Sequence, residues 1–254
     1  MINPKQYYLD TFRVTQPDLE QIIALALSKG GDWADLFFEN SYFSDLFLRD
    51  GEVTSGGFHV DYGVGIRVLS GDRTGYAYTE STSAADLRSA ALAASAIGHG
   101  TVRIPSIASL EGGYVPRLYK GVPNPAADRY PILQDWRECG ASQFVPFLEA
   151  LQEKVFSKDS RVIKMSAFLQ SQVSDIMMFN SFGELKYDTR PMGTLAVSAR
   201  FSDGKNVRSN HVSRSFRMGA EMLTDALLEE LAIQVVRGMD ERFEAKRPKG
   251  GRMD

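Results

Sequence analysis

Residues 50–81 contain glycines inside a pattern that is typical of β-strands. Their sequence is DGEVTSGGFHVDYGVGIRVLSGDRTGYAYTES. Its apolar residues alternate with other residues at Val64, Ile66, Val68, Tyr76 and Tyr78. This period of two predicts half-buried β-strands. Each glycine inside an ordered element costs about 0.5–1 kcal/mol relative to alanine, so several together need a structural reason such as a bulge, a tight corner or a closely approaching backbone. These glycines are Gly56, Gly57, Gly63, Gly65 and Gly75.

The whole chain predicts an α+β fold, with antiparallel or mixed sheets and helices packed against them. Glycine-rich strands are expected near 51–79, and alternating runs between turn signals predict a β-meander near 161–217. Two shorter strands, at 34–41 and 44–49, precede a turn at Asp50-Gly51. Helices are predicted at 15–29, 83–96, 142–156 and 219–237. Thr15 and Ser83 are expected to cap the first two, and Pro146 predicts that the regular part of the third begins near it.

This pattern divides the chain into four parts. Residues 1–97 are expected to form an N-terminal α+β subdomain, and residues 98–131, rich in Gly, Pro and Ser, a crossover loop. Residues 132–244 hold a helix, the β-meander and a C-terminal helix. The basic, Pro- and Gly-containing residues 245–254 are expected to be a linker.

The ordered motifs resemble the N-terminal half of the TldD/PmbA family, and its TldD branch more closely than its PmbA branch. They include the Gly-Val-Gly-Ile-Arg-Val strand at 63–68, the Thr-Gly-Tyr-Ala-Tyr strand at 74–78, the turn at Asn180–Gly183 and the Asp188–Pro191 segment. The resemblance covers about residues 15–254, and Asp61–Tyr78 is its most specific part.

The resemblance implies a role in a zinc metallopeptidase that acts on small or unfolded peptides. The family's His-Glu-x-x-x-His motif and its distant cysteine lie in a C-terminal half that follows the region present in this chain. The resemblance therefore implies no catalytic and no metal-binding residue here, zinc only with that missing half, and a linker at 245–254 that leads into it. The implied partners are the catalytic half and a PmbA-like or identical subunit, which would make a dimer. The chain alone is expected to be inactive.

Composition limits the compartment and the partners. The formal net charge of −3 and the pI of about 5.7 give no reason to expect nucleic acid or an anionic membrane as a partner. No apolar run approaches the roughly 20 residues that span a bilayer, and the N-terminus lacks the pattern of a leader. The single cysteine, Cys139, cannot form an internal disulfide. We therefore expect a cytoplasmic protein.

The residue types that carry catalysis are scattered. His59, His99 and His211 lack the spacing of a zinc site, and Cys139 lacks a neighbouring histidine in the sequence. The Gly63-Val-Gly65 pair lacks the third glycine and the following helix of a dinucleotide-binding loop, because Val68 stands in its place and the strand continues.

The glycine-rich strands are instead the candidate binding region. Bare backbone lets an extended peptide or a partner strand approach a sheet, and an internal bulge or corner is the alternative explanation. The candidate residues for peptide or partner approach are Gly56, Gly57, His59, Gly63, Gly65 and Gly75.

Three functions follow from these observations. The first is the non-metal-binding part of a TldD-like zinc peptidase, which shapes the substrate channel and subunit pairing. The second is a catalytically inactive adaptor or binding module on the same scaffold. The third is a nucleic-acid-associated regulator that acts through the hairpin at 200–217, where Arg200, Lys205, Arg208, Arg214 and Arg217 outnumber Asp203. A solvated strand edge protected by charge explains the same hairpin.

Overall fold

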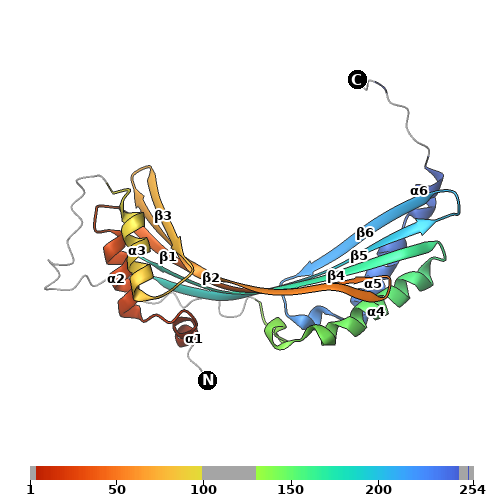
Figure 1. The fold of residues 1–254 in the computed structure, drawn as a ribbon, viewed down its shortest axis with the longest axis horizontal. Helices are drawn as coiled ribbons and strands as arrows, with labels where there is room; N and C mark the ends of the chain where they lie inside the picture. The colour runs from red at the N-terminus through yellow and green to blue at the C-terminus, as the bar shows by residue number, and fades with distance from the viewer. Residues whose placement is uncertain (1–3, 99–129, 246–250, 252–254) are drawn as a thin grey trace. The chain divides into compact units, whose positions relative to one another are not determined.

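A computed structural model describes residues 4–98, 130–245 and 251 (Figure 1). These residues form an α+β fold with a six-stranded antiparallel sheet in the order β3-β2-β1-β4-β5-β6, which confirms the predicted fold class. The helices are α1 (Pro4–Thr11), α2 (Gln16–Ala26), α3 (Ala84–Ser95), α4 (Ala141–Lys158), α5 (Asp225–Val236) and α6 (Met239–Glu244), with 3-10 turns at Trp136–Glu138 and Ala220–Met222. The strands are β1 (Trp33–Arg49), β2 (Glu52–Ser70), β3 (Arg73–Thr79), β4 (Val162–Asn180), β5 (Leu185–Ser202) and β6 (Val207–Phe216).

The chain forms two compact units that do not follow its linear order. Unit 1 comprises Met1–Tyr42, Val60–Tyr130 and Val173–Arg190, and unit 2 comprises Phe43–His59, Pro131–Gln172 and Pro191–Asp254. Strands β1, β2, β4 and β5 each contribute residues to both units.

In unit 1, α2 and α3 cover one face of the strands (Figure 1). Thr15 caps α2 through a capping box with Asp18, and the Ser83 side chain accepts the backbone N–H of Asp86 at the start of α3, so both predicted caps are confirmed. The core between helices and strands is apolar and almost fully buried. It includes Leu19, Ile22, Ile23, Leu36, Phe38, Val64, Ile66, Val68, Leu87, Ala91 and Ala94.

Gly75 lets α3 lie directly on β3. A Cβ placed at Gly75 would lie 2.1 Å from the carbonyl oxygen of Ala94 and 2.7 Å from Cγ2 of Ile97. Real Cβ atoms do not approach backbone atoms so closely, so a helix backbone occupies the space that a side chain would need.

In unit 2, α4 and α5 contact one another, and α5 also contacts β6. Buried residues recur along both helices at helical spacing, which supplies the apolar face that packs inward. They are Phe144, Leu148, Leu151 and Val155 in α4, and Leu227, Leu228, Leu231 and Val235 in α5.

The predicted turns are confirmed. Asp50 and Gly51 both have positive φ, at 50° and 90°, which suits a tight hairpin between β1 and β2. Gly183 and Gly204 are also left-handed, in the turns that join β4 to β5 and β5 to β6.

Several element boundaries differ from the prediction. The strands expected at 34–41 and 44–49 are one strand, β1, because no glycine or proline separates them. Helix α4 begins at Ala141 and contains Pro146. The proline removes the donor for the carbonyl of Ser142, and Ser142 is exposed, so water can replace that donor. The helix expected at 219–237 is a 3-10 turn followed by α5, and α6 comes after it.

The orientation of β3 also differs from the prediction. Tyr76 and Tyr78 were expected to lie on the half-buried side, but they are 63% and 70% exposed. Gly75 is buried and Ala77 is partly buried, because α3 lies too close to this side of β3 for a large side chain.

The crossover loop expected at 98–131 and the linker expected at 245–254 lie almost wholly outside the described residues. The division into 1–97, 98–131, 132–244 and 245–254 stays a prediction.

We predict that the substitution Gly75→Ala lowers the free energy of unfolding by about 2 kcal/mol, because the new Cβ overpacks the contact with α3. Gly56→Ala in β2 is the matched control, since its Cβ would meet neighbours only at 3.4 Å and that site is exposed. Urea denaturation followed by circular dichroism measures both. Equal stability of the two variants would contradict the close approach.

Candidate functional site

The six residues predicted for peptide or partner approach fall in both units. Gly63, Gly65 and Gly75 belong to unit 1, whereas Gly56, Gly57 and His59 belong to unit 2. Gly75 packs against α3, as described above. The other five lie on β2, and the side chains around each of them determine whether a ligand could reach that strand.

Gly63 and Gly65 lie on the face of the unit 1 strands opposite the helices. Val64 and Ile66 are buried toward α2 and α3, so the intervening positions point outward. Gly65 pairs with Tyr78 in the antiparallel register of β2 and β3. A Cβ at Gly65 would lie 2.6 Å from Oη of Tyr76, which places the tyrosine ring over the glycine. Gly65 therefore provides the space that the Tyr76 ring occupies.

An open groove of about 670 Å³ lies on this face. We call it the aromatic–acidic groove. It is lined by Phe37, Glu39, Val60, Asp61, Tyr62, Gly63, Val64, Gly65, Tyr76, Tyr78, Thr79 and Glu80. Three carboxylates and four aromatic rings are among these residues, and none of them is basic.

Next to the groove, three residues of β1 and β2 form a compact cluster. Arg67 donates two hydrogen bonds to the carboxylate of Asp35, at 3.0 and 2.9 Å, and its guanidinium lies 5.2 Å from the ring centroid of Trp33. The hydrogen bonds to Asp35 raise the pKa of Arg67. Asp35 is 4% exposed, so this pair is shielded more than an ordinary surface ion pair.

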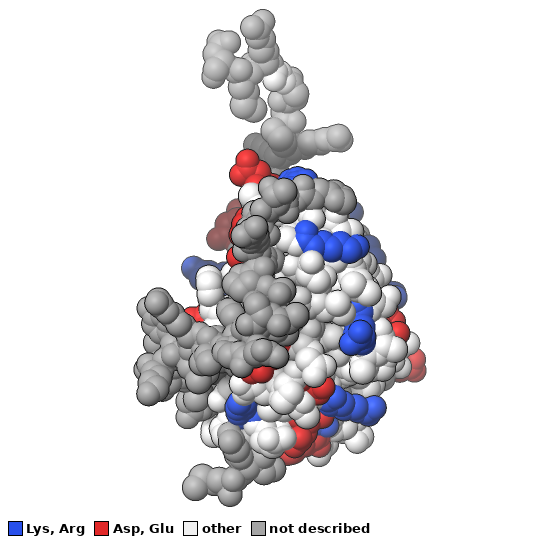
Figure 2. All heavy atoms as spheres, turned by 90° about the vertical axis from the view of Figure 1, so that its left-hand side faces the viewer, with Lys and Arg blue, Asp and Glu red and all other residues white. Residues whose placement is uncertain are grey.

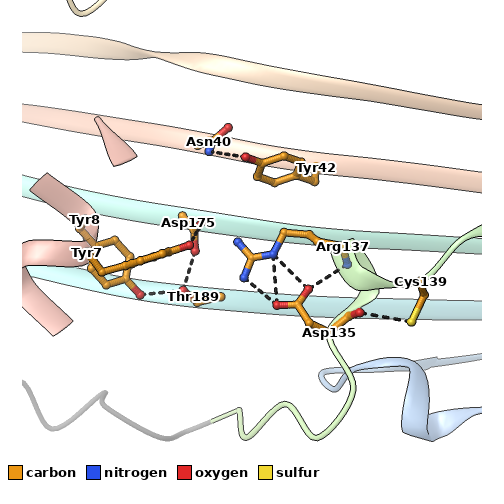
Figure 3. A network of polar contacts seen from close by, with 9 residues as sticks. All are labelled: Tyr7, Tyr8, Asn40, Tyr42, Asp135, Arg137, Cys139, Asp175 and Thr189. Atoms are coloured by element: carbon orange, nitrogen blue, oxygen red, sulfur yellow. Dashed lines mark hydrogen bonds and ion pairs between the residues drawn. The ribbon is translucent and has the colours of Figure 1, made fainter. Parts of the chain in front are cut away.

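A buried carboxylate anchors α1 within unit 1 (Figure 3). Asp175 accepts hydrogen bonds from the hydroxyls of Tyr7, at 2.8 Å, and Thr189, at 2.6 Å. The hydroxyls of Tyr8 and Thr189 lie 2.7 Å apart, and the Tyr8 ring stacks on Tyr187. Burial raises the pKa of Tyr8 to about 12, and the nearby charge of Asp175 adds to this shift. These contacts attach α1 to β4 and β5, which indicates a structural role.

The residues of β2 in unit 2 have different neighbours. The His59 ring stacks on Phe43, with centroids 4.5 Å apart and an interplanar angle of 7°. A Cβ at Gly57 would lie 2.8 Å from Oδ1 of Asp45, and Gly56 is also near Asp45. All three predicted residues here are exposed.

The described residues do not assemble a catalytic centre of a known type. No group of three or more His, Cys, Asp or Glu side chains in residues 4–98 and 130–245 is placed to hold a metal ion, and His99 lies outside the described residues. The donor set of a zinc site is therefore not found among the described residues. Cys139 donates to the carbonyl oxygen of Asp135 at 3.3 Å, and burial raises the pKa of its thiol, which opposes thiolate formation.

The hairpin of β5 and β6 uses two of its arginines internally. Arg208 donates to the carbonyl oxygen of Arg242, and Arg214 bonds Glu230 and Gln234 of α5. Arg200 lies instead with Arg49 and Lys164 in a groove of about 270 Å³ that also contains Asp50. The hairpin thus presents fewer free cations than its sequence indicates. Figure 2 faces the helices of unit 1 instead, where basic side chains are spread with uncharged surface between them.

The aromatic walls of the groove were missed by the sequence analysis. Tyr76 and Tyr78 were assigned to the half-buried side, and Phe37 and Glu39 were not singled out. A usable signal was present, because Gly75 and Ala77 are small residues at alternate positions of β3 and mark the side on which a helix packs closely.

Comparison with known proteins confirms the resemblance. The family described as PmbA/TldA metallopeptidase domain 1 matches residues 34–98. A metalloprotease TldD homolog of Haemophilus influenzae is 30% identical over 180 residues, covering 70% of this chain and 35% of that protein. A metalloprotease TldD homolog of Buchnera aphidicola (subsp. Acyrthosiphon pisum) is 28% identical over 182 residues, covering 70% and 34%. The chain is thus related to the TldD/PmbA metallopeptidase family and spans about a third of the length of these relatives.

Solved structures share the fold. A Thermotoga maritima protein named as a candidate modulator of a DNA gyrase superposes with a TM-score of 0.65 at 18% identity, covering 93% of this chain and 50% of that chain. TldE of Thermococcus kodakarensis superposes with a TM-score of 0.61 at 13% identity, covering 88% and 47%. At these identities the likeness establishes the fold alone.

We predict that Asp175→Ala lowers the free energy of unfolding by about 2–3 kcal/mol, because it removes a buried acceptor of two hydroxyl groups. Asp188→Ala is the matched control on the same pair of strands, since it removes an ion pair with Arg190 nearer the surface and should cost less than about 1 kcal/mol. Urea denaturation measures both. A smaller loss for Asp175→Ala than for the control would show that the network does not anchor α1.

The stability of the protein should fall as the pH rises from about 10 to about 12. The pKa of Tyr8 is raised in the folded state from 10.0 to about 12, so burial of its neutral form stabilises the fold below pH 10, and this contribution is lost above that pH. Tyr8→Phe cannot lose a proton, so the stability difference between the two proteins should shrink across this range. Urea denaturation at several pH values tests this, and a constant difference would contradict it.

Proposed function

We propose that this chain is the N-terminal, non-metal-binding part of a TldD-like zinc-dependent peptidase that acts on small or unfolded peptides. The observation that carries the proposal is the extent of the match. The metalloprotease TldD homologs align with about 70% of this chain but with only about a third of their own length, and the family's first domain matches residues 34–98. The remaining length of such relatives has room for a catalytic half.

In this proposal the chain binds and positions peptide and a partner subunit, and it performs no bond cleavage itself. The open strand face of unit 1 supports a contribution to a substrate channel, since it is concave and aromatic. Gly56, Gly57, His59, Gly63 and Gly65 supply the strand that peptide or partner approaches, while Gly75 contributes by seating α3. Zinc, where present, is held by the catalytic half.

The proposed partners are that catalytic half and a PmbA-like or identical subunit, paired as a dimer. The shared fold with TldE supports a family of related subunits with this architecture. None of the helices in residues 4–98 and 130–245 combines the length and apolar character that crossing a bilayer requires. We propose a cytoplasmic location.

A catalytically inactive adaptor is the second candidate. It is favoured by one observation, namely that a groove is built from the residues of unit 1 alone while no metal-binding group occurs among the described residues. An adaptor should remain monomeric and bind little hydrophobic dye, whereas a part of a larger peptidase should expose an apolar docking face and associate.

We predict that the purified 254-residue chain retains less than stoichiometric zinc and does not cleave unfolded peptides. Elemental analysis and a cleavage assay on an unfolded protein, with and without chelator, measure both. One equivalent of zinc together with chelator-sensitive cleavage would overturn the assignment to a non-metal-binding part. Sequencing the source DNA beyond codon 254 is the direct test of the larger peptidase, since it should find an in-frame His-Glu-x-x-x-His motif and a later cysteine.

A further inference from the structure

The aromatic–acidic groove has a floor and two walls set by the order of the strands. Strand β2 lies between β1 and β3, and its outward positions at 63 and 65 are glycines. Phe37 and Glu39 of β1 line one side, and Tyr76 and Tyr78 of β3 line the other. Close neighbours occupy the space beside these glycines, since a Cβ would lie 2.7 Å from the carbonyl oxygen of Thr79 at Gly63 and 2.6 Å from Oη of Tyr76 at Gly65. The surface offered to an extended ligand is therefore that of the tyrosine rings and the lining carboxylates.

The charged side chains that line the groove are all acidic among the described residues. Glu39, Asp61 and Glu80 line it, and no lysine, arginine or histidine in residues 4–98 and 130–245 does so. Arg67, on the same strands, is already bound to Asp35. A positively charged ligand would therefore meet carboxylates that no described lining cation neutralises.

We propose that the aromatic–acidic groove binds an extended, positively charged peptide segment through its arginine or lysine side chains. Tyrosine faces attract cations and carry large apolar area, and the carboxylates supply charge-assisted hydrogen bonds. The exposed Tyr76 ring is held in place over Gly65, so part of the binding surface is ordered before a ligand arrives.

The protein itself contains the arrangement that such a ligand would make. Arg67 lies over the Trp33 ring at 5.2 Å while its guanidinium forms two hydrogen bonds with Asp35. An arginine of the peptide, placed between Tyr78 and a lining carboxylate, would repeat this combination of a ring and an ion pair on the same strands.

A peptide fits the groove better than a single metal ion. The carboxylates come from β1, from β2 and from the residue after β3, and they do not form a group placed to hold a metal. Separated charges along a trough of about 670 Å³ match side chains spaced along an extended chain.

The test is a fluorescence anisotropy titration with fluorescein-labelled hexa-arginine at low ionic strength. The charge-neutral double variant Asp61→Asn/Glu80→Gln should raise the Kd about tenfold, and Tyr78→Ala should raise it about threefold. The matched controls remove the same charge or a comparable exposed ring outside the groove lining. They are Glu20→Gln/Asp72→Asn and Phe182→Ala, and each should leave the Kd within about twofold of the parent protein.

Two results would overturn the inference. One is a Kd that rises equally in the groove variants and in their controls, which would mean that hexa-arginine responds only to the overall negative charge. The other is parent protein that binds hexa-arginine no more tightly than labelled hexa-glycine. Thermal unfolding of each variant verifies that it is folded. Binding here requires no metal, so a failed zinc or cleavage assay would leave this inference unaffected, and a failed titration would leave the peptidase proposal unaffected.

Discussion

Unit 1 depends on the apolar contact between α2, α3 and one face of β1, β2 and β3. Successive strand residues point to opposite faces, so burial of Val64, Ile66 and Val68 against the helices forces the residues between them outward. The same contact requires a bare backbone at Gly75, where the end of α3 comes too close for a side chain. The positions of α2 and α3 thus determine which strand residues of unit 1 are buried and which face outward.

The outward face follows from this constraint. Once Gly75 and Ala77 face α3, Tyr76 and Tyr78 must face solvent. They line the groove on the far side of β2 from Phe37 and Glu39. Glycine has two distinct uses here, since Gly75 admits a helix and Gly65 admits a tyrosine ring. Both uses explain why a strand can tolerate residues that weaken it when considered alone.

The described residues form open grooves and no group placed to hold a metal ion. Cys139 is held as a protonated thiol by its surroundings, and two arginines of the β5–β6 hairpin are engaged by α5 and by Arg242. The aromatic–acidic groove, by contrast, is lined by carboxylates and by no basic side chain among the described residues. In the smaller groove, Asp50 pairs with Lys164 at 3.9 Å beside Arg49 and Arg200. The chain itself covers about a third of the length of its TldD relatives.

Local sequence determined much of this protein. The caps at Thr15 and Ser83 and the turn at Asp50-Gly51 follow from interactions among residues close in the chain. The α+β class and the relationship to the TldD/PmbA family were readable from the order of the sequence patterns. Helix α1 was missed because it is short and is stabilised by distant contacts, such as those of Tyr8 with Tyr187 and Thr189.

Only the tertiary structure decided which face of β3 is buried, and with it the existence of the groove. Alternation along β3 shows which side chains share a face, but it does not show which of the two faces is buried. Both faces of this strand carry residue types that are common in strands. The choice rests on the distance between the α3 backbone and Gly75, which involves residues outside the strand. The early start of α4, before Pro146, has a similar origin, because packing of this helix against α5 outweighs the local preference that predicted a later beginning.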